Sequence, residues 1–349
     1  MSAWSRPRRL RWLAWLIAPG VVAFVAYTNR DDLARAADLM GHASLAWMVP
    51  AVCAIGGVYL CRAAVYATPL TTLGFTFTRS FLWSTALVAT SVHQLVPTGG
   101  ASGYAFLTFA LHRRGVPGGQ ASLIALIDTL SYAVAVATLV IASVIYLATG
   151  GVLDARRLPL AFGPGLLAVA LAGWVYHVQG DRARFTRLAV RIKDRLAARL
   201  GREWSDGPIR RFLDEYYAGK AVVRRRPGAF LRMIGFQFLA VGCDATALYM
   251  AFLALGLTPK VWVVLTGFVV SMAALAIVGV PGGGGSFEVV MSMFFARHGL
   301  APAQGIAAAI LYRVVAFWLP VLVSLVVLIR LRERRKEVWK TGGRRRRGG

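Results

Sequence analysis

Eight runs of apolar residues, most of them long enough to cross a lipid bilayer, dominate this 349-residue sequence. An α-helix rises about 1.5 Å per residue, so roughly 20 apolar residues span a hydrocarbon core of about 30 Å. Only 16% of the residues are charged, whereas a soluble domain carries roughly a quarter. These features predict an all-α, multi-pass membrane protein. The expected helices cover residues 12–27, 45–65, 81–96, 121–148, 158–178, 230–257, 261–280 and 303–329.

Two further apolar runs, 101–111 and 286–296, are long enough for only about half of the hydrocarbon core. Each follows a Gly-rich turn, so we expect two half-helices or re-entrant segments that return toward the face from which the preceding helix came. The basic residues support this topology, because Lys and Arg are enriched in cytoplasmic loops. With both short runs turning back, 31 basic residues lie on the side of the N-terminus and six on the other side. Both termini are therefore predicted to be cytoplasmic.

The two Gly-rich turns are copies of one sequence. Val-Pro-Thr-Gly-Gly-Ala-Ser at 96–102 returns as Val-Pro-Gly-Gly-Gly-Gly-Ser at 280–286. Nine of the thirty residues from Val96 to Ala125 are identical to the residues 184 positions later. The charge distribution indicates that the first Gly-rich turn and its short run open toward the inside and the second toward the outside. This arrangement predicts an inverted repeat. Transporters with such repeats hold their substrate near the membrane midplane.

A half-helix that begins in a Gly-rich turn presents unpaired N–H groups and the positive end of its dipole, and both attract phosphate. Glycine lets an anionic group approach the backbone, and serine adds a hydroxyl group. The plainer interpretation is that Gly and Pro only kink the helices and let them pack closely. The duplication favours a lipid-headgroup site. Its predicted residues are Pro97, Gly99, Gly100, Ser102, Pro281, Gly283, Gly284 and Ser286.

Several ionisable residues lie inside the expected membrane helices, where charges are costly and usually face a partner, a cavity or a substrate. Under the repeat, Asp128 corresponds to Tyr312, the neighbour of Arg313, so the two helices are placed to bring an acid and a base together. A structural ion pair and a phosphate-binding arginine balanced by an acid are both compatible with this pattern. The charge-tuning candidates are Asp128, Glu288, Tyr312 and Arg313, and the secondary candidates are Asp244, His93, Gln94, Gln237 and Tyr132.

The basic residues lie in loops and tails around a single membrane domain, residues 12–330. This distribution favours anionic lipid over nucleic acid as the partner of the +25 net charge. The tails are residues 1–11 and 331–349, and the basic loop 180–229 contains an expected amphipathic helix with Leu188 and Ile192 on its apolar face. Such a helix lies well on an anionic leaflet, and a protein-docking surface is the alternative. The sequence has no nucleotide-binding, hydrolase or metal-ligand motif, so neither a cofactor nor enzymatic activity is expected.

Three stretches resemble the transmembrane region of lysylphosphatidylglycerol synthases, which is also called the flippase-like domain. They are the Leu-Val-Pro-Thr-Gly-Gly stretch at 95–100, the Val-Pro-Gly-Gly-Gly-Gly-Ser-Phe-Glu stretch at 280–288, and the Leu-Tyr-Arg-Val-Val-Ala-Phe-Trp-Leu-Pro stretch at 311–320. The resemblance covers roughly residues 12–330 and implies an inner-membrane domain that moves a lipid between leaflets. The positions that it implies are functional are Gly283, Gly284, Glu288, Tyr312 and Arg313.

Full-length synthases of this kind also carry an aminoacyltransferase domain, which is not visible here, so this chain is not expected to make lysylphosphatidylglycerol alone. The leading hypothesis is a translocator of the bacterial cytoplasmic membrane for an anionic phospholipid, a polyprenyl-phosphate lipid or a glycolipid. One alternative is a non-transporting membrane partner that recruits a lipid-modifying or glycosyl-transferring enzyme through the basic loop. A membrane-embedded transferase is the weakest alternative, because no nucleophile or metal site accompanies the acids.

Overall fold

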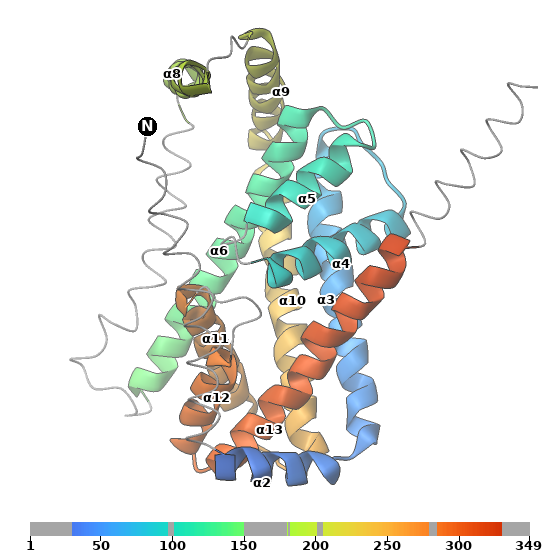
Figure 1. The fold of residues 1–349 in the computed structure, drawn as a ribbon, viewed down its shortest axis with the longest axis vertical. Helices are drawn as coiled ribbons and strands as arrows, with labels where there is room; N and C mark the ends of the chain where they lie inside the picture. Colours follow the sequence, from blue (N-terminus) through green and yellow to red (C-terminus); the bar gives the residue numbers. More distant parts are fainter. Residues whose placement is uncertain are drawn as a thin grey trace, which may run out of the picture.

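The computed structural model describes residues 30–96, 101–149, 180, 182–200, 205–278 and 285–329. Every regular element within these ranges is a helix, as the apolar pattern predicts. The helices are α2 (Arg30–Gly41), α3 (Leu45–Thr72), α4 (Arg79–Leu95), α5 (Ala101–His112), α6 (Gly118–Thr149), α8 (Arg182–Leu200), α9 (Gly207–Arg224), α10 (Pro227–Ala254), α11 (Val261–Val278), α12 (Ser286–Ala296) and α13 (Pro302–Arg313), drawn in Figure 1. A π-helical turn, η3 (Val314–Trp318), continues α13. The expected helices at 12–27 and 158–178 lie outside the described residues.

Within the described ranges, four helices are long and apolar enough to cross a membrane: α3, α6, α10 and the continuous helix from Pro302 to Ile329. Their outer faces expose large apolar side chains, including Leu60, Leu231 and Leu322, which are 63%, 68% and 58% exposed. Water would disfavour such surfaces, whereas lipid tails match them. The structure therefore confirms the predicted helical, multi-pass membrane fold.

The two expected short runs form short helices of 12 and 11 residues, α5 and α12. Each follows a helix of intermediate length and precedes a long one. The first set is α3, α4, α5 and α6, and the second is α10, α11, α12 and the helix that starts with α13. The two sets thus share one order of helix lengths, which matches the duplication in the sequence.

The two sets run in opposite directions (Figure 1). At one end of the molecule, which we call the α2 end, the N–H of Ser44 before α3 donates to the carbonyl oxygen of Ala254 at the end of α10 (2.8 Å). The start of α13 lies at the same end, because Ile306 packs against the buried Ala36 of α2. At the opposite end, the α9 end, Leu73 after α3 lies beside Gly219 of α9. Helices α3 and α10 are therefore antiparallel neighbours, as an inverted repeat requires.

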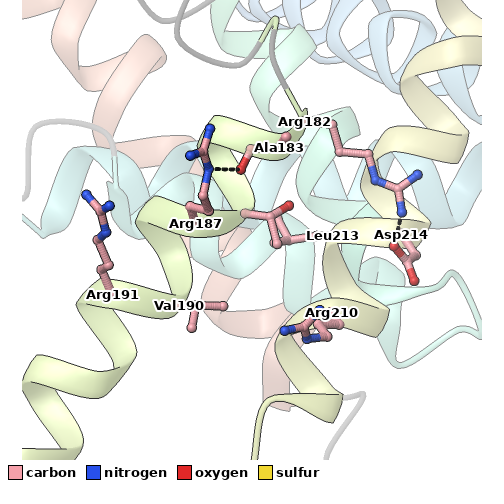
Figure 2. Close-up of a pocket in the computed structure, with 9 residues that line it drawn as sticks. Arg182, Ala183, Arg187, Val190, Arg191, Arg210, Leu213 and Asp214 are labelled. Atoms are coloured by element: carbon pink, nitrogen blue, oxygen red, sulfur yellow. Dashed lines mark hydrogen bonds and ion pairs between the residues drawn. The ribbon is translucent and has the colours of Figure 1, made fainter.

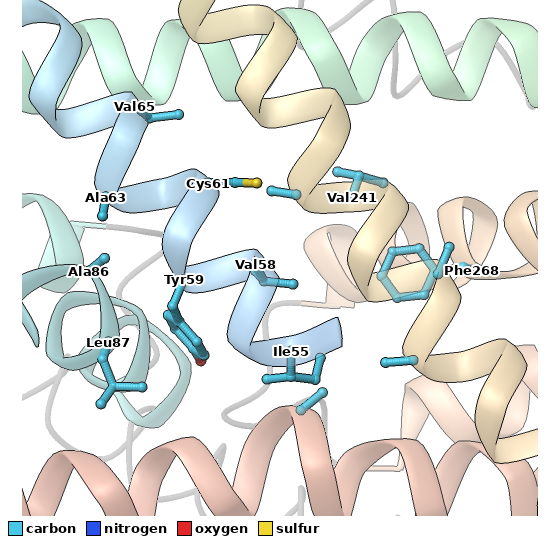
Figure 3. Packing of buried hydrophobic residues seen from close by; sticks show 14 of the residues in the cluster. Ile55, Val58, Tyr59, Cys61, Ala63, Val65, Ala86, Leu87, Val241 and Phe268 are labelled. Carbon is cyan, nitrogen blue, oxygen red and sulfur yellow. The ribbon is translucent and has the colours of Figure 1, made fainter. Parts of the chain in front are cut away.

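The core lies where α3 packs along α10, as Figure 3 shows. Val58 and Cys61 of α3 point toward Val241 of α10 in this view, and all three are buried. Buried alanines such as Ala63 and Ala245 accompany them. Small residues let helix backbones approach closely in a membrane, where dispersion contacts and hydrogen bonds rather than exclusion of water hold helices together.

The basic loop contains two helices rather than one. The predicted amphipathic helix is α8, and α9 follows it with Leu213 and Tyr216 buried. Helix α9 lies against the start of α6, where the N–H of Gly119 donates to a carboxylate oxygen of Glu215 (3.0 Å). A Cβ atom at Gly119 would lie 2.1 Å from the carbonyl oxygen of Phe212, so only glycine permits this approach. The sequence pattern did not indicate α9, nor the helix α2 between the first two apolar runs.

Candidate functional site

The central helix pair carries one partly buried ionisable residue on each helix, at the same count from the helix start. Arg62 is the eighteenth residue of α3, and Asp244 is the eighteenth residue of α10. The side chains of the residues before them, Cys61 and Cys243, lie close to each other across the two helices. The antiparallel packing therefore brings the middle parts of α3 and α10 together, with Arg62 and Asp244 at the same count from the two helix starts.

Arg62 lies among polar and aromatic side chains from three other helices. Its Nη1 donates to the hydroxyl of Thr90 on α4 (3.3 Å), and its guanidinium lies 5.9 Å from the ring centre of Tyr132 on α6. Its positive charge lies near enough to attract two carboxylates, those of Asp128 and Asp244. The Nε atom of Arg62 is buried and has no hydrogen-bond partner among the residues that the structure describes. The site thus retains one donor for a further acceptor.

Asp128 on α6 is bound by a side chain from α10. Gln237 donates from its amide nitrogen to Oδ1 of Asp128 (3.0 Å) and also lies 3.3 Å from the hydroxyl of Ser131. Gln237 is 2% exposed. A buried amide between a carboxylate and a hydroxyl links α6 to α10 inside the membrane domain, where unsatisfied polar groups are costly.

Asp244 is linked to the last helix of the second repeat. The hydroxyl of Tyr312 donates to Oδ1 of Asp244 (3.2 Å). The ring of Tyr312 stacks on Phe287 of α12, with 5.7 Å between ring centres, and meets Phe268 of α11 edge-on at the same distance. Tyr312 therefore links Asp244 of α10 to the short helix α12.

The next residue, Arg313, forms an ion pair with that half-helix. Its Nε lies 2.9 Å from Oε1 of Glu288, and both side chains are 17% exposed. The guanidinium also lies 5.3 Å from the ring centre of Phe287. The second carboxylate oxygen of Glu288, Oε2, is buried and has no hydrogen-bond partner within the described part of the chain. A further hydrogen-bond donor would satisfy it.

Backbone features on both sides shape this ion pair. Helix α12 begins after Gly285, whose φ of +85° is a left-handed conformation that favours glycine. Glu288 is in the first turn of α12, where the helix dipole stabilises a negative charge. Directly after Arg313, the helix widens into the π-helical turn η3. Such turns occur frequently at functional sites in membrane and soluble helices alike.

The structure describes only part of the predicted headgroup site. Pro97, Gly99, Gly100, Pro281, Gly283 and Gly284 lie outside the described residues, as does the side chain of Ser286. The hydroxyl of Ser102 lies 3.4 Å from the carbonyl oxygens of Val92 and Val96, so it contacts the end of α4. Whether these turns hold a headgroup therefore remains a prediction.

The predicted charge candidates are distributed over several contacts. Asp128 and Arg313 have the separate partners described above, Gln237 and Glu288, instead of forming the acid–base pair that the repeat suggested. Asp244, a secondary candidate, is a hydrogen-bond partner of Tyr312. His93 is exposed, and Oε1 of Gln94 is buried without a partner.

Arg62 is the site residue that the sequence interpretation missed. It is a single arginine within the apolar run at 45–65, and a charge at such depth is a functional signal in its own right. Because Arg62 lies inside an expected helix, it is not among the loop and tail residues that predict the topology. Aligning the helices α3 and α10 by their starts, which the structure alone supplies, pairs it with Asp244.

Comparison with known proteins agrees with this architecture. A family model described as the lysylphosphatidylglycerol synthase TM region matches residues 11–324. The chain belongs to this family. The matched residues contain helices α2 to α13 and the ionisable residues Arg62, Asp244, Glu288 and Arg313.

One curated relative is the UPF0104 membrane protein PH1989 of Pyrococcus horikoshii, which is 30% identical over 127 residues. The aligned part covers 36% of this chain and 37% of that protein, so the chain spans little more than a third of the relative's length. The relative's name states a membrane protein and no substrate. The comparison supports the family and the membrane location.

Proposed function

We propose that this chain moves an anionic lipid between the two leaflets of a membrane and is not itself an enzyme. The observation that carries the proposal is a series of partly buried ionisable residues between two oppositely oriented helix sets. Arg62 and Asp244 lie on the central helices, and Tyr312 connects Asp244 to the Arg313–Glu288 pair. Charged groups inside a membrane domain usually contact a substrate, a coupled ion or each other.

In the proposed mechanism, the half-helices α5 and α12 hold the phosphate of the lipid headgroup at their starts. Their exposed N–H groups and dipoles attract a negative charge. Glu288 already lies in the first turn of α12 and holds Arg313. An incoming phosphate would replace the Glu288 carboxylate as the binding partner of the Arg313 guanidinium. The lipid tails would remain against the apolar outer faces of the long helices.

The two helix sets would then expose this site alternately to each leaflet, as inverted repeats do in other transporters. The sequence contains no nucleotide-binding motif, so the movement is proposed to be downhill or coupled to an ion. We place the protein in the bacterial cytoplasmic membrane, with the basic α9 end and both termini on the cytoplasmic side, because basic residues are retained there.

A transport assay in proteoliposomes tests this function. Purified protein is reconstituted with fluorescent phosphatidylglycerol, and a membrane-impermeant quencher reports the fraction of lipid that reaches the outer leaflet. We expect wild-type protein to speed this exchange over empty vesicles and Arg313→Gln to abolish most of the gain. The control is Arg297→Gln, which removes an exposed arginine just after α12. Equal rates for Arg313→Gln, the control and wild type would contradict the proposal.

The alternative, a membrane partner that recruits a lipid-modifying or glycosyl-transferring enzyme, is favoured by one observation, the basic α8 at the α9 end. It makes the opposite prediction for two variants. Neutralising the basic face of 184–199 would abolish function in cells, while Gly283→Val or Arg313→Gln would leave it intact. The translocator proposal expects Arg313→Gln to abolish function.

A further inference from the structure

Helices α8 and α9 enclose a groove that the proposed transport site does not use. The groove has a volume of about 640 Å³, within the range of roughly 300–1,000 Å³ that is typical of ligand pockets. Figure 2 shows its lining side chains, which come from both helices. They are Arg182, Ala183, Thr186, Arg187, Val190, Arg191, Arg210, Leu213 and Asp214.

The charge of the groove is strongly positive. Four of its lining residues are arginines, and Asp214 is the one carboxylate among them. Asp214 is already paired with Arg182. Arg187 and Arg191, one turn apart on α8, therefore have no carboxylate partner among the lining residues. Guanidinium groups bind phosphate through paired N–H donors, which makes a phosphate group the matching ligand.

The scaffold around the groove is held in place on both sides. Lys193 of α8 forms an ion pair with Asp206 at the start of α9, and the Lys193 ammonium holds the pKa of Asp206 below its ordinary value. Arg210 also contacts Asp206 (3.5 Å). Helix α9 is in turn bound to α6 through Glu215 and Gly119. The groove is thus built on packed helices at the end of the membrane domain.

Apolar side chains beside the arginines point to a lipid rather than a soluble anion. Leu188 and Ile192 of α8 are 46% and 49% exposed, and Phe212 of α9 is 39% exposed. Val190 and Leu213 line the groove itself. A phospholipid combines an anionic phosphate with apolar chains, and amphipathic basic helices bind such lipids at the membrane interface.

We infer that the groove between α8 and α9 binds the headgroup of an anionic phospholipid, at a site separate from the transport pathway. This lipid attaches helices α8 and α9 to the membrane surface. Because the site lies outside the buried charge network, it neither depends on nor tests the transport function. Acidic protein partners and free phosphate are the competing ligands.

Short-chain dioctanoyl phosphatidylglycerol, titrated into the purified full chain in detergent micelles, tests this inference through its dissociation constant. The groove variant is Arg187→Gln with Arg191→Gln. The matched control is Arg184→Gln with Arg195→Gln, which removes the same charge from the same helix outside the groove. We expect about tenfold weaker binding for the groove variant, since each lost phosphate contact weakens binding severalfold, and less than about twofold for the control.

Further arms distinguish the sources of the signal. Arg313→Gln should keep the groove affinity, which separates this site from the transport site. Dioctanoyl phosphatidylcholine, whose headgroup has no net charge, should bind far more weakly than dioctanoyl phosphatidylglycerol. The inference is overturned if the two double variants weaken binding equally. It is also overturned if inorganic phosphate binds as tightly as the lipid, or if a Glu-rich peptide binds the groove and the lipid does not.

Discussion

Removal of either partner of the Arg313–Glu288 pair should destabilise the protein by a predictable amount. Breaking a buried ion pair leaves one charge uncompensated and costs about 3–5 kcal/mol. Both side chains retain 17% exposure, so the remaining charge keeps some solvent contact. We therefore expect Glu288→Gln to lower the free energy of unfolding by about 3 kcal/mol, and Arg313→Gln to lower it by a similar amount. The double variant has no unpaired charge, so its loss should fall about 1–3 kcal/mol short of the sum.

The free energies of unfolding would be measured by denaturant titration in micelles, with intrinsic tryptophan fluorescence as the signal. The reversed pair, Glu288→Arg with Arg313→Glu, should regain much of the unfolding free energy that each single variant loses, because the attraction between opposite charges is restored. It should still fail to move lipid, since the guanidinium then lies on the half-helix instead of the long helix. Additive single effects would refute an energetic coupling between the two residues. Lipid movement by the reversed pair would refute a phosphate-binding role for Arg313.

Three other contacts give independent tests. Mild oxidation of the purified protein with copper phenanthroline should join Cys61 to Cys243, since their side chains lie close together across α3 and α10. Peptide mapping would detect the link, and its absence would argue against the antiparallel α3–α10 packing. Tyr312→Phe removes the hydrogen bond to Asp244. It should lower the free energy of unfolding by about 1–3 kcal/mol, because the carboxylate acceptor loses its donor. No loss in a denaturant titration would mean that the bond contributes nothing. Gly119→Ala should push α9 off α6, because its Cβ would lie 2.1 Å from a carbonyl oxygen of α9; faster proteolysis between α8 and α9 would report this, and unchanged cleavage would contradict the close approach.

Much of the helical layout could be predicted because the membrane imposes a strict length requirement on apolar helices. The six expected long runs within the described residues all correspond to helices, and the two short runs correspond to α5 and α12. Helix α3 continues to Thr72, past the predicted end at 65, because the residues from 66 to 72 remain compatible with a helix despite Pro69. Helices α2 and α9 were missed because neither contains an apolar run long enough to cross a membrane.

The candidate site was only partly predictable. Glu288, Tyr312, Arg313 and Asp244 could be named, because charged and polar groups within apolar runs are conspicuous. Their partners could not be named, because the repeat relates positions in the sequence without giving the rotation of each helix about its axis. The suggested approach of Asp128 to Arg313 failed for this reason, since Asp128 faces Gln237 of α10.

The sequence by itself determined that the chain is a helical membrane protein with a duplicated half-helix motif, since hydrophobic length and backbone hydrogen bonding leave few other structures in a bilayer. Only the tertiary structure decided that Arg62 and Asp244 occupy matching places on antiparallel helices, and that Tyr312 and Arg313 connect them to Glu288. The physical reason is that contacts between helices depend on which face each helix turns toward its neighbour. That choice is made by the packing of the whole bundle, which no single segment encodes.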